Sequence, residues 1–278
     1  MIPRVLLGIL AMLSLATAPA TASDAGEVLY LANTGLLVRS GDTKVLFDPL
    51  FRNSYGTYQL VPSGIERDLL AGEPPFDGVD AVFISHFHGD HFDAQEIVRY
   101  LEAQPSVLLF APRQAMDELE FFLDPDAATV NARLRTINID YGDAAQTLAE
   151  GDLLVEAFHV PHSGWPQRRP EVQNIAFRVT LNDGPVVLHM GDADTRPEHF
   201  AIDADLWAAR ETDMAFPPYW YFMSEKGQAV LDTTIRPRAA VGVHVPVRLD
   251  ADAEQALTGY DIFRRPSETR PLTESATQ

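Results

Sequence analysis

The residues with the clearest chemical potential lie in one short segment, SHFHGDH at positions 85–91. His86 and His88 are two residues apart, so their side chains point the same way if the segment continues as extended chain. The glycine that follows permits a sharp change of direction, after which Asp90 and His91 present two further ligands. Imidazole nitrogens and carboxylates together suit zinc, iron or manganese. Because the chain contains no cysteine, the sequence predicts a metal site built from histidine and carboxylate alone.

Hydrophobic patterning indicates which elements position this segment. Residues 80–85 (DAVFIS) are dominated by a continuous apolar run, as in a strand that is buried on both faces. Asp93 and Glu96 form a capping box, which predicts a helix immediately after the histidines. Upstream, turn residues separate three strand candidates, at 27–32, 36–39 and 44–48. This spacing predicts an antiparallel meander.

The rest of the chain alternates strand and helix signals. A strand at 107–110 leads to a predicted helix at 112–123, which has Met116, Leu119 and Phe122 on one face. Later strands are expected at 134–139, 153–158, 175–181, 186–190, 214–216 and 239–243, and later helices at 203–210 and 225–233.

The overall organisation follows from the turns and from the absence of a linker. The tripeptide Asn182-Asp183-Gly184 predicts a hairpin between two of the later strands. The polar tail at 267–278 is expected to fray. No segment rich in Pro, Gly or Ser divides the chain, so residues 23–278 are expected to form a single α+β domain, most simply two packed sheets with helices outside.

The first 22 residues have the pattern of a cleaved signal peptide. Arg4 precedes an apolar run at 5–16, and the small residues Ala20 and Ala22 flank Thr21 as in a cleavage site. The run is shorter than the roughly 20 residues needed to span a bilayer. We therefore expect a mature protein that is periplasmic or secreted, without stable membrane association. An anchoring or buried N-terminal helix is the alternative.

The charge of the chain bears on its partners. Its 278 residues include 21 Lys and Arg against 40 Asp and Glu, a net charge of −19. Nucleic-acid binding requires a basic surface that neutralises phosphates, so this balance argues against such partners. The expected partner is a small-molecule substrate, and the sequence leaves the oligomeric state open.

The pattern H-x-H-x-D-H at the end of an apolar strand resembles the signature of the metallo-β-lactamase superfamily, and four further segments are similar to other motifs of that family. These segments are LFDP at 46–49, VPHS at 160–163, LHMGD at 188–192 and VGVH at 241–244. The opening, NTGL at 33–36 through Asp48, is especially similar to the L-ascorbate-6-phosphate lactonase-like branch. The resemblance implies a four-layer αββα sandwich with a metal site at one edge.

The same resemblance implies a set of ligands for two metal ions, with zinc as the default and manganese or iron as alternatives. The first ion would be bound by His86, His88 and His162. The second ion would be bound by Asp90, His91 and His244, and Asp192 would bridge the two ions.

Several other residues have more than one possible role. His159 competes with His162 for the third-histidine role, because the strand alternation would end near His159, whereas the His-Ser pairing favours His162. His159 is then a catalytic helper that carries a proton, or a partly buried residue at a strand end. We expect His189 to pair with the backbone or a carboxylate, and His199 to lie at the surface where a helix starts. Asp48 either orients a ligand histidine from behind or caps a turn.

Two segments near the expected site could contact substrate. The loop at 164–170 (GWPQRRP) carries Arg168 and Arg169, whose guanidinium groups could hold phosphate or carboxylate, or could simply be solvated. The aromatic cluster at 216–222 (FPPYWYF) could line a pocket, pack in the core or form a dimer surface. The chain has no cysteine that could act as a ligand, and no lysine lies near the later motifs. Both features separate it from β-lactam hydrolases.

These observations predict a metal-dependent hydrolase. Hydroxide formed from metal-bound water would attack a small ester, lactone or phosphoester, and Asp90 would both bind metal and orient the nucleophile. The alternatives are a non-enzymatic metal-binding or scaffold protein of the same fold, a β-lactamase or thioesterase, and a di-iron oxidoreductase. Because no motif residue is missing, the complete ligand set favours an enzyme.

Overall fold

The computed structural model describes residues 26–124, 126 and 128–272. The signal peptide predicted for residues 1–22 lies outside the described residues, as does the end of the tail, 273–278. Among the described helices, none is both long enough and apolar enough to cross a membrane.

The first sheet has seven strands in the described part of the chain, in the order β13-β1-β2-β3-β4-β5-β6. Their bounds are β1 Gly26–Ala32, β2 Gly35–Ser40, β3 Thr43–Phe47, β4 Ala81–Phe83, β5 Leu108–Pro112, β6 Leu134–Ile137 and β13 Thr269–Leu272. The predicted meander is confirmed, because β1, β2 and β3 pair antiparallel through tight turns in which Asn33 and Gly41 adopt positive φ. Strands β3 to β6 run parallel.

The second sheet has six strands among the described residues, in the order β12-β11-β10-β9-β8-β7. Their bounds are β7 Gln146–Glu150, β8 Leu153–His159, β9 Ile175–Leu181, β10 Val186–His189, β11 Met214–Phe216 and β12 Ala239–Ala240. The hairpin between β9 and β10 is confirmed, with Asn182 and Asp183 both at positive φ. Strands β7 to β10 are antiparallel, and β10 to β12 are parallel.

Helices connect and cover the sheets. They are α1 Ser63–Ala71, α2 Ala94–Ala103, α3 Arg113–Leu119, α4 Ala128–Asn131, the 3₁₀ turn η1 Pro197–Phe200, α5 Ala204–Ala209, α6 Trp220–Met223, α7 Glu225–Ala229, the π-helical segment η2 Val230–Ile235 and α8 Ala251–Ala256. The Asp93 side chain caps α2 as predicted, since it accepts a hydrogen bond from the Glu96 N–H at 3.0 Å. The Glu96 carboxylate does not return the bond. It pairs with Arg52 instead, and the Asp93 N–H donates to the Leu50 carbonyl.

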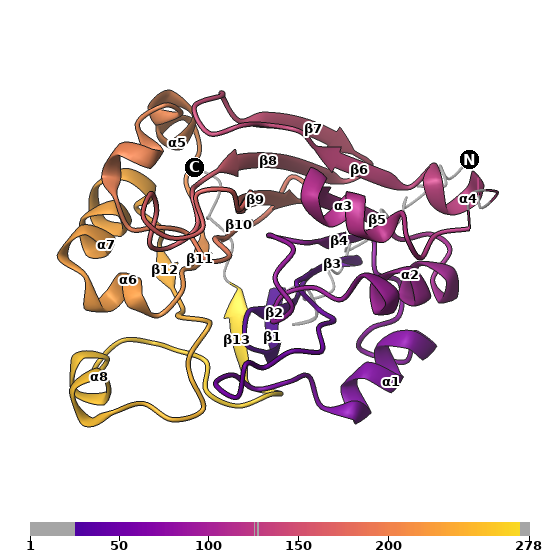
Figure 1. Cartoon of the computed structure of the whole chain (residues 1–278), viewed down its shortest axis with the longest axis horizontal. Coiled ribbons are helices and arrows are strands. Elements are labelled where there is room, and N and C mark those ends of the chain that lie inside the picture. Colours follow the sequence, from indigo (N-terminus) through magenta and orange to yellow (C-terminus); the bar gives the residue numbers. More distant parts are fainter. Residues whose placement is uncertain (1–25, 125, 127, 273–278) are drawn as a thin grey trace, which may run out of the picture.

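The two sheets and the helices outside them form layers, whose arrangement can be followed in Figure 1, and three buried clusters lie between these layers. The central cluster lies between the two sheets and includes Phe47 and Phe83 of the first sheet and Phe177 of the second. A second cluster lies between the first sheet and α1, α2 and α3. A third lies between the second sheet and α5, α6 and α7. The predicted four-layer αββα sandwich is therefore confirmed.

Some local predictions were wrong. The tail does not fray at 269–272, where β13 pairs with β1 and Leu272 is buried. The helix predicted to reach residue 123 ends at Leu119, which leaves Phe122 half exposed. Helices α1 and α8 and strand β7 had no clear signal in the sequence. α8 and β7 are short, whereas α1 has no side-chain N-cap and buries only Leu69. Such elements depend on tertiary packing more than on intrinsic propensity.

Candidate metal centre

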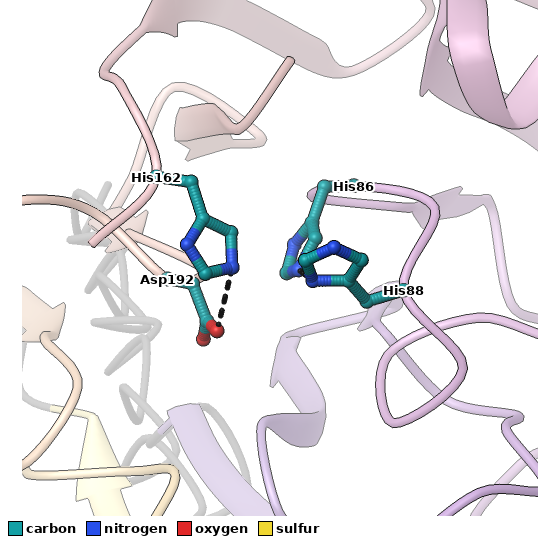
Figure 2. Close-up of side chains that lie close together, drawn as sticks. All are labelled: His86, His88, His162 and Asp192. Atoms are coloured by element: carbon teal, nitrogen blue, oxygen red, sulfur yellow. Dashed lines mark hydrogen bonds and ion pairs between the residues drawn. The ribbon is translucent and has the colours of Figure 1, made fainter. Parts of the chain in front are cut away.

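The structure brings together all seven residues predicted as metal ligands. They form two groups, in each of which the possible ligand atoms lie within 4.8 Å of one another. The first group, drawn in Figure 2, consists of His86, His88, His162 and Asp192, and its side chains face one another. The second group consists of Asp90, His91 and His244.

The ligands lie together because they follow strands that end at the same edge of the sandwich. His86 follows β4 and Asp192 follows β10, and His162 and His244 follow β8 and β12. The loops after β8 and β10 are joined directly: His162 and Ala193 form an isolated antiparallel bridge, and the Ser163 N–H donates to the Asp192 carbonyl at 2.7 Å. Carboxyl ends of neighbouring parallel strands commonly form binding sites in this way.

Asn174, which sequence reasoning missed, holds two ligand loops in place. Its side-chain amide donates to the carbonyls of Val160 and Met190, and its Oδ1 accepts the Asp192 N–H at 2.9 Å. Gly191 makes this approach possible, because its φ is +53° and an added Cβ would collide with Oδ1 of Asn174 and lie 2.7 Å from the Ser85 Cβ. The only signal in the sequence was a polar residue directly before the apolar strand β9.

Asp48 orients His91 through the ring nitrogen that faces away from the other ligands, which is one of the two roles predicted for it. Its Oδ2 lies 2.8 Å from Nδ1 of His91, and the Ser85 N–H and hydroxyl donate to the same carboxylate. Burial raises the pKa of Asp48, but the neighbouring His189 and His91 outweigh this effect and hold the pKa below its usual value. The carboxylate therefore stays charged, and Nε2 of His91 is left for the second ligand group.

Within the two groups, several possible ligand atoms lie close to one another. Nε2 of His86 and Nδ1 of His88 are 3.0 Å apart, and Nε2 of His91 and Nε2 of His244 are 3.1 Å apart. The two oxygens of Asp192 face different groups: Oδ2 lies 3.1 Å from His162, whereas Oδ1 lies 3.0 Å from His244. Although each of these atoms has such a neighbour, Asp192 Oδ1 and His162 Nε2 are buried and make no hydrogen bond among the described residues. Cations between these atoms would satisfy them.

The two groups differ in their protonation. Burial and the neighbouring His91 hold the pKa of His86 well below its usual value, and burial together with His162 lowers the pKa of His88 to about 4. For His91, burial lowers the pKa, but Asp192 and Asp90 outweigh it and raise the pKa well above the usual value. The pKa of His244 is raised for the same reason, mainly by Asp192. His86 and His88 are therefore neutral imidazoles at pH 7, whereas protons compete with cations for His91 and His244.

The remaining histidines have other surroundings. His159 lies outside both groups, with Nδ1 3.2 Å from the Ile139 carbonyl. His189 pairs with the backbone as predicted, through the Thr34 carbonyl at 3.0 Å. The surface position predicted for His199 is wrong: only 3% of the residue is exposed, because η1 packs inward and places Nδ1 2.9 Å from the Tyr141 hydroxyl.

Aromatic side chains border the second group. The rings of Tyr58 and Trp220 contact the His244 ring edge-on, at centroid distances of 4.1 and 5.3 Å. The predicted aromatic cluster at 216–222 is thus divided, with Phe216 in the core and Trp220 beside the site. Arg168 and Arg169 are exposed. Burial raises the pKa of Tyr58, whereas the positive charge of Arg169 lowers it. The Arg169 charge is therefore felt at Tyr58, which borders the second group.

Two relatives are similar in sequence. The chain is 36% identical over 75 residues to UPF0173 protein YddR of Bacillus subtilis, which is 24% of this chain and 29% of the relative. It is 26% identical over 168 residues to Protein Rv0786c of Mycobacterium tuberculosis, which is 60% of this chain and 64% of the relative. Each alignment thus spans less than two thirds of the relative's own length.

Solved structures share the fold at low identity. A possible metal-dependent hydrolase from Veillonella parvula has a TM-score of 0.60 at 16% identity, over 89% of this chain and all of that one. Igni18, a metallo hydrolase from Ignicoccus hospitalis, has a TM-score of 0.58 at 19% identity, over 90% of this chain and 99% of that one. The E377D mutant of the β-hydroxylase CmlA has a TM-score of 0.54 at 16% identity, over 91% of this chain and 54% of that one. The fold therefore serves hydrolases and a hydroxylase.

The sequence also matches a family directly. The model of the β-lactamase superfamily domain covers residues 43–245, which include every residue of the two ligand groups. Given this match, the αββα sandwich and the ligand groups at its edge, the chain belongs to the metallo-β-lactamase superfamily.

Proposed function

We propose that this protein is a hydrolase that binds two divalent cations and cleaves a small ester, lactone or phosphoester. The observation that carries the proposal is the position of Asp192, whose two oxygens face the two ligand groups separately. A carboxylate so placed can bridge two ions. Zinc suits the cysteine-free, histidine-rich set, and manganese or iron would accept the same ligands.

Two divalent cations at these groups would lower the pKa of a water molecule from about 15.7 towards about 7 and stabilise negative charge on the substrate oxygen. The chain's own residues would position the reactants. The Asn33 side-chain amide donates to the Asp90 carbonyl at 2.8 Å and to the Asp90 Oδ2 at 3.4 Å. These bonds restrict the movement of a carboxylate that would orient the attacking water. Asp90 is buried, and its pKa is held low by His91 and His244 against the effect of burial.

Access to the site is favoured on one side. Of the seven proposed ligands, all of them described residues, His88 alone is not buried. Substrate would therefore approach past the His88 ring. His159 is proposed as an auxiliary proton carrier: burial lowers its pKa, so its imidazole is neutral at pH 7 and can accept a proton.

Metal content and a substrate screen together test the proposal. Purified protein should hold about two equivalents of transition metal by elemental analysis, and His244→Ala should lower the value to about one. Panels of esters, lactones, thioesters and phosphodiesters should identify a class whose hydrolysis stops with a chelator and returns with metal. A value near one that His244→Ala leaves unchanged would exclude the second ion. Fully loaded protein that hydrolyses no class would favour the metal-binding scaffold.

Membership of the lactonase-like branch and export from the cytoplasm are part of the proposal. Motif similarity near residues 33–36 supports the branch, and the pattern at 1–22 supports export to the periplasm or outside the cell. Protein recovered from its host should begin near Ser23. Intact residues 1–22 on a soluble cytoplasmic protein would contradict export.

A further inference from the structure

A groove of about 400 Å³ borders the exposed side of the metal centre, with His88 in its wall. We call it the His88 groove. Its aromatic lining consists of Tyr55, Phe87, Phe92 and Phe122. A volume of this order suits a small molecule or part of one. Polar side chains also line the groove beside the aromatic rings, namely those of His88, Asp93, Gln95 and Glu118.

The chain keeps two aromatic rings at the groove in contact with solvent. Phe122, beyond the end of α3, is 50% exposed, and Tyr55 is 57% exposed. Tyr55 has a positive φ of 48°, uncommon for a residue other than glycine, and the Asn53 side chain stabilises this turn by accepting the Tyr55 N–H at 2.8 Å. Large apolar side chains gathered at the surface mark binding sites more often than chance exposure does.

The groove is joined rigidly to the metal-binding motif. The Asn53 N–H donates to the Gly89 carbonyl at 2.9 Å, and a Cβ at Gly89 would lie 3.0 Å from the Asn53 Cβ. The turn that carries Tyr55 therefore rests directly on the loop between His88 and Asp90. Because His88 also belongs to the first ligand group, a group bound in the groove lies next to one residue of the metal centre.

The charges at the groove restrict what it can bind. Glu118 and Asp93 contribute carboxylates to its lining, and burial together with Asp93 raises the pKa of Glu118. An anionic group would be repelled there, whereas an uncharged apolar chain would cover the aromatic rings. His88, the one proposed ligand that is not buried, lines the groove. A group bound there can therefore belong to a substrate that reaches the metal centre.

We propose that the His88 groove binds an uncharged apolar group of the substrate, so that esters or lactones with a medium-length acyl chain are preferred to short ones. This inference rests on the proposed hydrolase function. The reaction it specifies is balanced: the water oxygen bonds to the acyl carbon, the acyl C–O bond breaks, and the leaving alcohol takes a proton. An ester yields a carboxylic acid and an alcohol, and a lactone yields a single hydroxy acid.

Chain-length dependence is the direct test. We would measure kcat/KM of the metal-loaded protein for p-nitrophenyl acetate, butyrate and hexanoate. Full burial of one methylene is worth about fourfold, so hexanoate should exceed acetate by at least about tenfold even with partial burial. In Phe122→Ser and Tyr55→Ser the hexanoate-to-acetate ratio should fall about fivefold or more. The ratio is independent of the fraction of protein that folds.

Phe121 supplies a matched control. It is 85% exposed, adjacent in sequence to Phe122 and absent from the groove lining, so Phe121→Ser should keep the wild-type ratio. A binding measurement that needs no turnover separates the two proposals: hexanamide should bind the metal-loaded protein more tightly than acetamide, and Phe122→Ser should remove the difference.

Two results would overturn the acyl groove, and a third would overturn the proposed function while leaving the groove in place. Ester hydrolysis without chain-length dependence would exclude the acyl groove and leave the hydrolase function intact. Hexanamide selectivity without hydrolysis of any class would instead overturn the proposed function and preserve the groove as an apolar binding site. If phosphatidylcholine vesicles bind the wild type, and Phe121→Ser and Phe122→Ser weaken that binding equally without changing the ratio, the aromatic rings form a membrane-contacting surface rather than an acyl site.

Discussion

The Asp48 carboxylate and the His91 imidazole are 2.8 Å apart, and both side chains are fully buried. Thr34 and Ser85 donate hydroxyl hydrogen bonds to the same carboxylate, which leaves it little freedom to turn. The contact assigns one ring nitrogen of His91 to Asp48 and the other to the second ligand group. Asp48 therefore orients a residue of the second ligand group without belonging to that group.

Replacing Asp48 should weaken the second site selectively. Asp48→Asn keeps the size of the side chain but removes the charge that orients His91, so affinity for the second ion should fall by about 10–100-fold. Competition with a chromophoric chelator measures this change. Asp42→Asn, at an exposed turn position, is the control. Equal affinity in both variants would mean that Asp48 serves only the turn.

Asp90→Ala should lower kcat by several orders of magnitude while the fold is retained. The substitution removes one metal ligand and the group that aims the attacking water, and the Asp90 side chain contacts residues of the site rather than the core. Steady-state kinetics and circular dichroism together check both parts. A loss of less than tenfold would exclude Asp90 from the chemistry.

His162→Ala and His159→Ala should separate a ligand from a helper. His162→Ala should remove the first ion and the activity together, because His162 belongs to the first group. His159→Ala should keep both ions and cost about 10²-fold or less in kcat, as for an auxiliary proton carrier. If His159→Ala strips metal while His162→Ala retains it, the third-ligand assignment is reversed.

The two ions should be lost at different pH values. His86 and His88 have lowered pKa values, about 4 for His88, so they stay neutral as the pH falls from 8 to 5. His91 and His244 have raised pKa values, so protons displace an ion from the second group at higher pH. Elemental analysis after dialysis should show His244→Ala, which retains the first group, keeping its ion to lower pH than His162→Ala. The opposite order would contradict this electrostatic account.

A buried ion pair away from the two ligand groups should affect the stability of the protein but not its metal content. The Arg178 guanidinium donates to Glu156 at 2.6 and 3.0 Å and to the Leu206 carbonyl, which joins the second sheet to α5. Glu156→Leu alone would leave a buried cation and should cost roughly 3–5 kcal/mol of unfolding free energy, measured with urea. The double variant Arg178→Met/Glu156→Leu should regain most of this loss. Metal content should not change in either protein.

The local parts of the site could be predicted from the sequence. The spacing of His86, His88, Asp90 and His91 after an apolar strand is a short-range property, since the direction of each side chain follows from extended chain and a turn. The turns at Asn33 and at Asn182-Asp183 were predictable for the same reason, because these residue types tolerate positive φ. The family motifs placed Asp192 and His244 in order along the chain.

The tertiary structure decided everything that depends on contacts between distant segments. Asn174 bonds to three separate loop positions, and His199 is buried by a helical turn with no strong apolar signal. Strand β13 pairs through backbone groups, which every sequence carries, so its polar side chains did not reveal it. The His88 groove likewise combines the turn at Tyr55 with the end of α3, and only the folded chain brings those segments to the same ligand, because packing acts on distance in space and not on separation in sequence.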